Sequence, residues 1–143
     1  MKKVLLVLSF VSASAFAHEN EAIKGRCMII DGTNKIVPCK IVTGGGAGGM
    51  YTTYKVGKKE ITVEESTMCK NDEATCDTTM GTNSSKSMPA KNYYRDYRTK
   101  KVINDLPKKG NYWSCTKQIK GKLDACTDYG LWIAKKFHLD ISN

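Results

Sequence analysis

Apolar and polar residues alternate along much of the chain, which is the pattern of half-buried β-strands. The alternation is clearest between Met50 and Glu65, where Gly57-Lys58 provides a two-residue turn with glycine in the first central position. Folding about this turn brings residues 51–56 opposite residues 59–64, so that Lys55 faces Glu60. One face of this predicted hairpin then carries Met50, Thr52, Tyr54, Val56, Ile61 and Val63.

A second hairpin is predicted from about Ile23 to Thr43, with its turn in Asp31-Gly32-Thr33-Asn34. If the turn centres on Thr33, Cys27 lies directly opposite Cys39. Pro38 favours an edge position, because proline cannot donate a hydrogen bond to a strand ladder. The predicted core face carries Ile23, Cys27, Ile29, Val37, Cys39 and Ile41.

A third hairpin is predicted from Trp113 to Asp128, with Lys120-Gly121 as a two-residue turn. Counting outward from this turn pairs Ile119 with Lys122, Lys117 with Asp124, and Cys115 with Cys126. Directly opposed residues lie within disulfide range.

The remaining segments give weaker signals. The polar stretch from Ser66 to Asn92 has few aliphatic residues and is predicted to be a long surface loop. The segment 91–105 is expected to be a strand or a short helix, and Pro107–Gly110 a turn. Leu131–Leu139 has helical spacing and is expected to form a closing helix or a strand.

The fold class that follows is mainly β, a small antiparallel barrel or sandwich of disulfide-stapled hairpins with a short C-terminal helix. All six cysteines follow residue 17, an even number that favours disulfides in a small exported domain. The expected bridges are Cys27–Cys39, Cys69–Cys76 and Cys115–Cys126. The main alternative pairs Cys69 or Cys76 with a cysteine of another hairpin.

The first 17 residues have the three parts of a secretory signal peptide. Lys2 and Lys3 precede the apolar stretch 4–11, and Ala15-Phe16-Ala17 supplies small residues for cleavage. The apolar stretch is too short for a membrane span, which needs roughly 20 residues. We therefore expect a single domain over residues 18–143, located in the bacterial periplasm or secreted, with no transmembrane segment.

The formal net charge of +9 favours anionic partners. Cations and tyrosines interleave after residue 90, a pattern that can neutralise anions while stacking on rings. The candidate ligand-binding residues are Lys91, Tyr93, Tyr94, Arg95, Tyr97, Arg98, Lys100 and Lys101. An alternative interpretation is a solvated element whose tyrosines pack inward.

Other candidate chemistry is sparse. The Gly44–Gly49 run leads into a strand rather than a helix, so we interpret it as a flexible link between hairpins or an adaptable ligand loop, not a phosphate-binding loop. Two histidines are few general bases for an enzyme. No cofactor or metal site is predicted, although His18 at a cleaved N-terminus could hold copper together with His138.

Two resemblances add to this picture. Gly25-Arg26-Cys27, Pro38-Cys39-Lys40-Ile41 and the Trp113-Ser114-Cys115 hairpin resemble a loose class of small exported disulfide-bonded bacterial β proteins, which implies an architecture. Gly46-Ala47-Gly48-Gly49-Met50-Tyr51 is faintly similar to the glycine-rich loop of periplasmic c-type lysozyme inhibitors, which are small disulfide-bonded β-barrels.

We therefore expect a non-catalytic binding protein whose partner is an anionic ligand or acidic protein of the envelope or the extracellular space. The alternative is a proteinaceous inhibitor of a hydrolase such as lysozyme. Sequence alone does not assign an oligomeric state.

Overall fold

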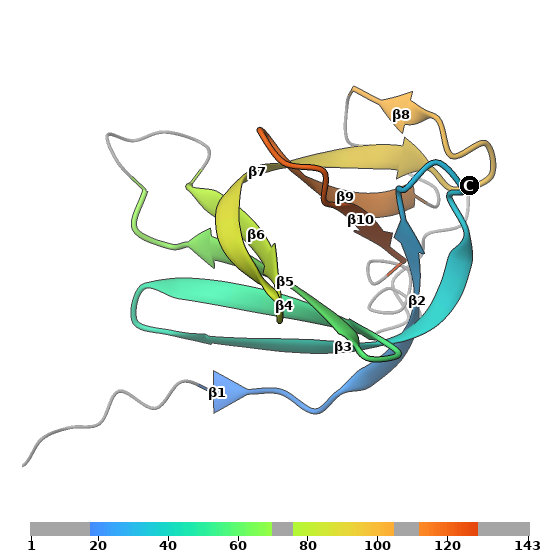
Figure 1. The fold of residues 1–143 in the computed structure, drawn as a ribbon. Coiled ribbons are helices and arrows are strands. Elements are labelled where there is room, and N and C mark those ends of the chain that lie inside the picture. The colour runs from blue at the N-terminus through green and yellow to red at the C-terminus, as the bar shows by residue number, and fades with distance from the viewer. Residues whose placement is uncertain (1–17, 70–75, 105–111, 129–143) are drawn as a thin grey trace, which may run out of the picture.

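A computed structural model describes residues 18–69, 76–104 and 112–128. These residues form ten strands in one antiparallel sheet, and no helix occurs among them (Figure 1). The strands are β1 (His18–Glu19), β2 (Ile23–Ile29), β3 (Ile36–Gly46), β4 (Gly49–Val56), β5 (Lys59–Ser66), β6 (Thr78–Thr82), β7 (Ser85–Asp96), β8 (Val102–Ile103), β9 (Tyr112–Gln118) and β10 (Asp124–Thr127). The expected mainly-β class is confirmed.

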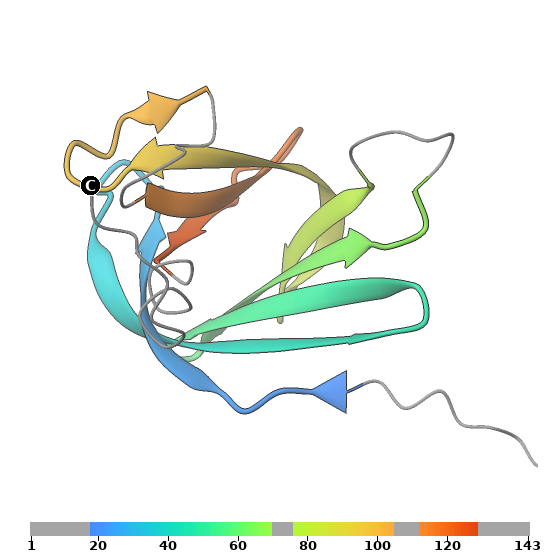
Figure 2. The same cartoon turned by 180° about the vertical axis from the view of Figure 1, so that it is seen from behind.

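Eight of the strands close into a barrel. Their order is β3-β2-β10-β9-β7-β6-β5-β4, and β4 pairs again with β3. Apart from the detour through β8, strands that are consecutive in sequence are neighbours in the barrel, and the first and last barrel strands, β2 and β10, pair to close it. The barrel is therefore of the up-and-down type. β1 extends the ladder beside β3 and β8 pairs with β7, both outside the ring (Figures 1 and 2).

Two of the predicted registers are confirmed. In the β4–β5 hairpin, Tyr51 faces Glu64 and every pair up to Val56–Lys59 matches the prediction. Only Gly57 of the two turn residues has a positive φ, of 60°, as a type II′ turn requires. In the β9–β10 hairpin, Cys115 faces Cys126. That ladder ends at Lys117–Asp124, two pairs before the predicted Ile119–Lys122, and the Ile119 N–H donates to the Pro89 carbonyl.

The register of the β2–β3 hairpin differs from the prediction by two residues. Cys27 faces Val37, and Cys39 faces Gly25. The turn centres on Gly32, which has φ 96°, and the Asp31 carboxylate accepts hydrogen bonds from the Thr33 N–H and hydroxyl. A shift of two residues keeps every side chain on its face, so the Cys27–Cys39 disulfide still forms, between diagonal positions with Cα atoms 5.8 Å apart.

Pro38 occupies the edge position that its chemistry requires. It faces Arg26 of β2, and β4 does not reach it, because the β3–β4 pairing begins at Lys40. The two other expected bridges, Cys69–Cys76 and Cys115–Cys126, are also present, and no described cysteine is free.

The predicted long loop between Ser66 and Asn92 is wrong. This stretch contains β6 and more than half of β7, which complete the barrel. Met80 and Ala90 are buried in the inner cluster, but their neighbours on both faces are largely Thr, Ser, Lys, Gly and Pro, so the segment lacks the aliphatic alternation that marks a strand. The helical alternative for 91–105 is also wrong, because β7 continues to Asp96.

Two apolar clusters lie on opposite faces of the barrel wall. The inner cluster fills part of the lumen and contains Cys27, Cys39, Ile41, Tyr54, Ile61, Val63, Met80, Ala90 and Ala125. The outer cluster contains Met28, Trp113, Cys115 and Cys126, with Tyr93 and Tyr97 packed against it. One disulfide therefore lies in each cluster.

Several expectations concern residues that the structure does not describe. These are the signal peptide at 1–17, the Pro107–Gly110 turn, the closing helix or strand at 131–139, and His138. No helix in the described residues is long and apolar enough to cross a membrane.

Candidate functional site

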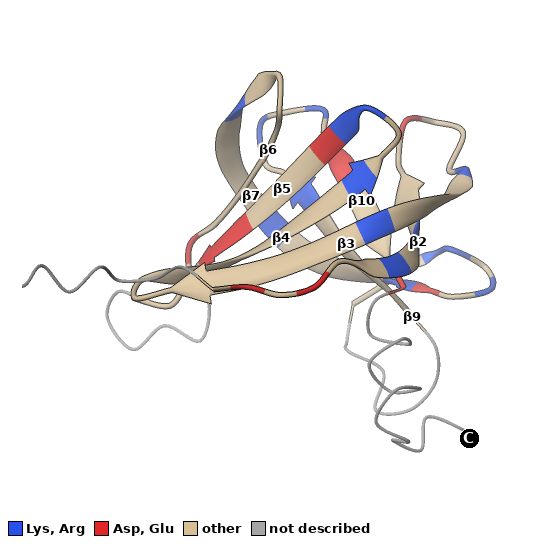
Figure 3. Ribbon diagram, turned by 90° about the horizontal axis from the view of Figure 1, so that it is seen from below, with Lys and Arg blue, Asp and Glu red and all other residues tan. Residues whose placement is uncertain are grey.

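Basic residues face each other across the outer surface of the barrel. Lys24, Lys40 and Lys55 occupy directly paired positions on β2, β3 and β4, and Lys55 then meets Glu60 of β5 at 3.6 Å (Figure 3). Lys91 of β7 likewise faces Lys117 of β9, and both are exposed. Like charges in directly opposed positions repel, so both sets raise the free energy of the unliganded protein.

The predicted residues Tyr93 and Arg95 form a cation–aromatic pair on the outer face. The Arg95 guanidinium carbon lies 5.3 Å from the Tyr93 ring centroid, and its Nε donates to the Tyr93 hydroxyl at 3.1 Å. That hydroxyl donates to the buried Asp124 carboxylate at 2.6 Å. Burial, followed by this hydrogen bond, raises the pKa of Tyr93 to about 12. Both side chains are half-buried and are held by contacts within the barrel wall, so only part of each is accessible to a ligand.

Tyr97 is also engaged within the protein. Its ring stacks on Trp113 with centroids 5.3 Å apart, and the Trp113 indole N–H donates to the Tyr97 carbonyl at 3.2 Å. The Arg26 guanidinium carbon lies 5.5 Å from the Tyr97 ring centroid, and Arg26 forms a salt bridge of 2.8 Å with Asp128. The hydrogen bond from Arg26 to Asp128 raises the pKa of the guanidinium.

Three predicted cations lie in or beside the turn after β7. The Asp96 carboxylate accepts the N–H groups of Arg98 and Thr99, at 3.0 and 2.6 Å. The backbone hydrogen bond from Thr99 is the main cause of a lowered pKa at Asp96. None of Arg98, Lys100 and Lys101 forms a salt bridge with a described residue.

The structure therefore divides the eight predicted residues. Lys91, Arg98 and Lys101 are exposed cations, Lys100 and Arg95 are half-buried, and Tyr93 and Tyr97 belong to the outer cluster. Tyr94 faces the lumen, where its ring meets Tyr112 edge-on at 5.3 Å. Sequence reasoning missed Lys117, because its position beside Lys91 depends on which strand pairs with β7.

The lumen keeps a cavity of about 280 Å³ beside the inner cluster. Side chains of five strands line it, and the described lining is Met50, Thr52, Tyr54, Val63, Glu65, Asn92, Tyr94, Tyr112, Ser114, Thr116 and Thr127. Glu65 is the one charged residue in this described lining. The Asn92 amide donates to Glu65 at 2.6 Å and accepts from the Thr116 hydroxyl at 2.8 Å, which links β5, β7 and β9 across the lumen.

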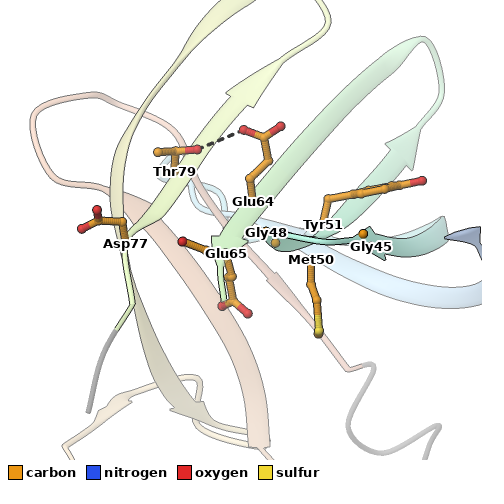
Figure 4. Close-up of a pocket in the computed structure, with 11 residues that line it drawn as sticks. Gly45, Gly48, Met50, Tyr51, Glu64, Glu65, Asp77 and Thr79 are labelled. Carbon is orange, nitrogen blue, oxygen red and sulfur yellow. Dashed lines mark hydrogen bonds between the residues drawn. The ribbon is translucent and has the colours of Figure 1, made fainter. Parts of the chain in front are cut away.

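The Gly44–Gly49 run connects the two flanking hairpins, but it is not a flexible link. It forms the tight end of the β3–β4 hairpin, in which Gly46 faces Gly49 and Gly44 faces Tyr51. A second cavity, of about 390 Å³, lies beside it. Figure 4 shows Glu64, Tyr51 and Thr79 on one side of the wall and Met50 and Glu65 on the other, with Thr79 donating to Glu64 at 3.2 Å.

No group of His, Cys, Asp and Glu in the described part of the chain is arranged to hold a metal ion. His18 is exposed in β1, and His138, the second histidine considered for copper, lies outside the described residues. No family model matches this chain, and no curated protein or solved structure similar to it was found.

Proposed function

We propose that this protein is a non-catalytic binding protein of the periplasm or the extracellular space, and that it holds an extended anionic ligand on the outer surface of β7 and β9. The contact residues are Lys91, Arg98, Lys100, Lys101 and Lys117. Three disulfides fit an oxidising compartment of this kind.

The spacing of the cations favours a polymer over a single small anion. Lys91 and the turn that begins at Asp96 are five residues apart on one strand, which corresponds to about 17 Å at roughly 3.3 Å per residue. A sulfated or phosphorylated glycan can contact both ends, whereas one phosphate group cannot. The tyrosines are engaged in the wall, so the proposal assigns ligand contact to the cations alone.

The observation that carries the proposal is the direct opposition of Lys91 and Lys117 on the surface that also carries the turn cations, none of which forms a salt bridge with a described residue. Lys117 also faces Asp124 of β10 but forms no salt bridge with it. A bound anion would relieve this repulsion, so binding should also raise the stability of the folded state. The Lys24–Lys40–Lys55 row is a weaker candidate, because its last lysine is already paired with Glu60.

The test compares dextran sulfate with uncharged dextran, which has the same backbone. We expect dextran sulfate alone to bind, with an affinity that falls steeply as salt rises. Lys91→Gln/Lys117→Gln should weaken binding several-fold and flatten the salt dependence. The matched control, Lys24→Gln/Lys40→Gln, removes two charges from another facing pair and should have a smaller effect. Equal losses of affinity in the two variants would mean that binding depends on the net charge of the protein rather than on these positions, and would contradict the proposed site.

The second candidate function is inhibition of a hydrolase such as lysozyme by the β3–β4 turn. Exposed apolar side chains near the glycine turn favour it, since Met50 is 58% exposed and Met68 is 75% exposed. Met68 also lies next to Gly48. Lysozyme activity measured with the wild-type protein and with Ala47→Lys tests this candidate. Inhibition of lysozyme by the wild-type protein but not by the variant supports this candidate. Full lysozyme activity in the presence of the wild-type protein rejects it.

A further inference from the structure

The lumen cavity holds an acidic group in an otherwise basic protein. Glu65 lies near the C-terminal end of strand β5 and lines the lumen cavity. It forms no ion pair with any described residue. Its side-chain hydrogen-bond partner among the described residues is the neutral amide of Asn92. A half-buried carboxylate without a cationic partner attracts positive charge, so a cation that enters the cavity would find a counter-ion there.

The walls around Glu65 are aromatic and polarisable. Tyr54, Tyr94 and Tyr112 line the same cavity, and the Met50 thioether lies at its exposed rim. Tyrosine faces attract cations, most strongly where water is excluded. Burial and, to a smaller extent, the charge of Glu65 raise the pKa of Tyr54, which keeps this phenol neutral.

The remaining lining excludes the other ligand classes. The described lining contains no Lys, Arg or His that could hold an anion, and its hydroxyl and amide groups are too many for a purely apolar guest. A cavity of about 280 Å³ is small for a drug-sized molecule, for which pockets of roughly 300–1,000 Å³ are usual. The size and chemistry together fit a compact ligand with one positive charge.

We propose that the lumen cavity binds a small organic ammonium ion, with Glu65 as its counter-ion and the rings of Tyr94 and Tyr112 as its wall. This site lies on the inner face of the barrel and is separate from the anion-binding surface of the proposed function. It requires no change in the fold, because Asn92 already orients Glu65.

The first experiment uses the wild-type protein and a matched pair of probes. One probe is choline, and the other is its neutral isostere in which a tert-butyl group replaces the trimethylammonium group. Isothermal titration should show choline binding about tenfold or more tightly than the isostere, since the two differ only in charge. Equal affinities, or no choline binding at millimolar concentration, would overturn the proposal without any mutation.

The second experiment locates the site by neutralising, one at a time, two neighbouring carboxylates that point to opposite faces of the barrel wall. Glu65→Gln keeps the shape and the hydrogen bond from Asn92, and should weaken choline binding about tenfold or more. Glu64→Gln removes the same charge from the outer face, where Glu64 accepts a hydrogen bond from Thr79, and should leave the affinity unchanged. Equal losses in the two variants would place the cation outside the lumen.

A third comparison tests the aromatic wall. Tyr94→Phe keeps the ring and should retain choline binding, whereas Tyr94→Leu keeps an apolar side chain without a ring and should lose it several-fold. Loss in both variants, each with an unchanged melting temperature, would mean that the hydroxyl group rather than the ring holds the ligand, and would contradict the proposed recognition.

Discussion

Single residues in this barrel are most constrained where two strands come unusually close. Gly81 is buried in β6 at the point where the β6–β7 register shifts, between Met80 and Thr82. A Cβ atom placed on Gly81 would lie 2.9 Å from the Ser87 Cα, and backbone atoms cannot move aside as a flexible side chain can. The close approach of β6 and β7 therefore depends on glycine.

Gly81→Ala should lower the free energy of unfolding by about 1–3 kcal/mol, the usual cost of overpacking. Gly48→Ala is the control, because the Met68 sulfur at 4.0 Å is the nearest atom to a Cβ there. Urea unfolding of both variants checks this prediction. A Gly81→Ala variant as stable as Gly48→Ala would contradict the close packing of β6 and β7.

The Tyr93 hydroxyl predicts a pH dependence. Its pKa is raised from 10.0 to about 12 in the folded state, so its contribution to stability is fully present below pH 10 and is lost as pH rises through about 12. At neutral pH, Tyr93→Phe should cost about 1–3 kcal/mol, because the buried Asp124 loses its donor.

The stability difference between wild type and Tyr93→Phe should then shrink as the pH rises from 10 towards 12. Denaturant unfolding of both proteins across that range measures this difference. A difference that stays constant would mean that the Tyr93–Asp124 contact does not control the ionisation of Tyr93.

At the scale of the elements, local turn chemistry determined how well the strands could be predicted. Gly57-Lys58 specifies one short turn, and the register it implies is correct to the last pair. The Asp31–Asn34 loop offers several turn centres, and the positive φ of both Gly32 and Asn34 selects one that moves the register by two residues. The disulfide prediction survived this error because a two-residue shift keeps both cysteines on the inner face.

The strands β6 and β7 could not be found in the same way. Barrel strands need apolar residues only on the inner face, and here Met80, Met88 and Ala90 are too widely spaced among hydroxyl residues to form a visible pattern. The candidate site had the same difficulty. The cations after residue 90 are visible in the sequence. The position of Lys117 beside Lys91, and the cavity that Glu65 lines, depend on how distant strands pair in the barrel.

The assignment of β6 as a wall strand predicts a large effect at Met80. This side chain is fully buried in the inner cluster, so Met80→Ala should cost about 2–5 kcal/mol. Met68→Ala makes the same change at a side chain that is 75% exposed and should shift stability by no more than about 0.5 kcal/mol. Thermal unfolding that shows similar small shifts in both variants would restore the loop interpretation.

The lysine row on β2, β3 and β4 predicts a stabilising substitution. Lys40 lies between Lys24 and Lys55, so Lys40→Glu converts two repulsive contacts into attractive ones. We expect a gain of about 0.5–1 kcal/mol in low salt, which should disappear in high salt because these groups are exposed. Lys58→Glu, in the β4–β5 turn, is the control. A loss of stability in Lys40→Glu would contradict the observed strand pairing.

At the scale of the whole molecule, the barrel wall separates two electrostatic environments. The outer surface carries facing lysines, whereas the described lumen cavity carries Glu65 as its one charged residue. Because side chains alternate between the two faces of each strand, the outer lysines point away from the lumen, and Glu65 inside it remains without an ion pair to them. The account therefore assigns ligands of opposite charge to opposite faces.

Amide NMR of the isotope-labelled protein, titrated separately with dextran sulfate and with choline, tests this assignment most directly. Dextran sulfate should shift amide signals of Lys91, Lys117 and the turn at 97–101, and choline should shift those of Glu65, Tyr94 and Tyr112. Each ligand should also bind in the presence of the other. Shifts of the same amides by both ligands, or displacement of one by the other, would contradict the separation of the two faces.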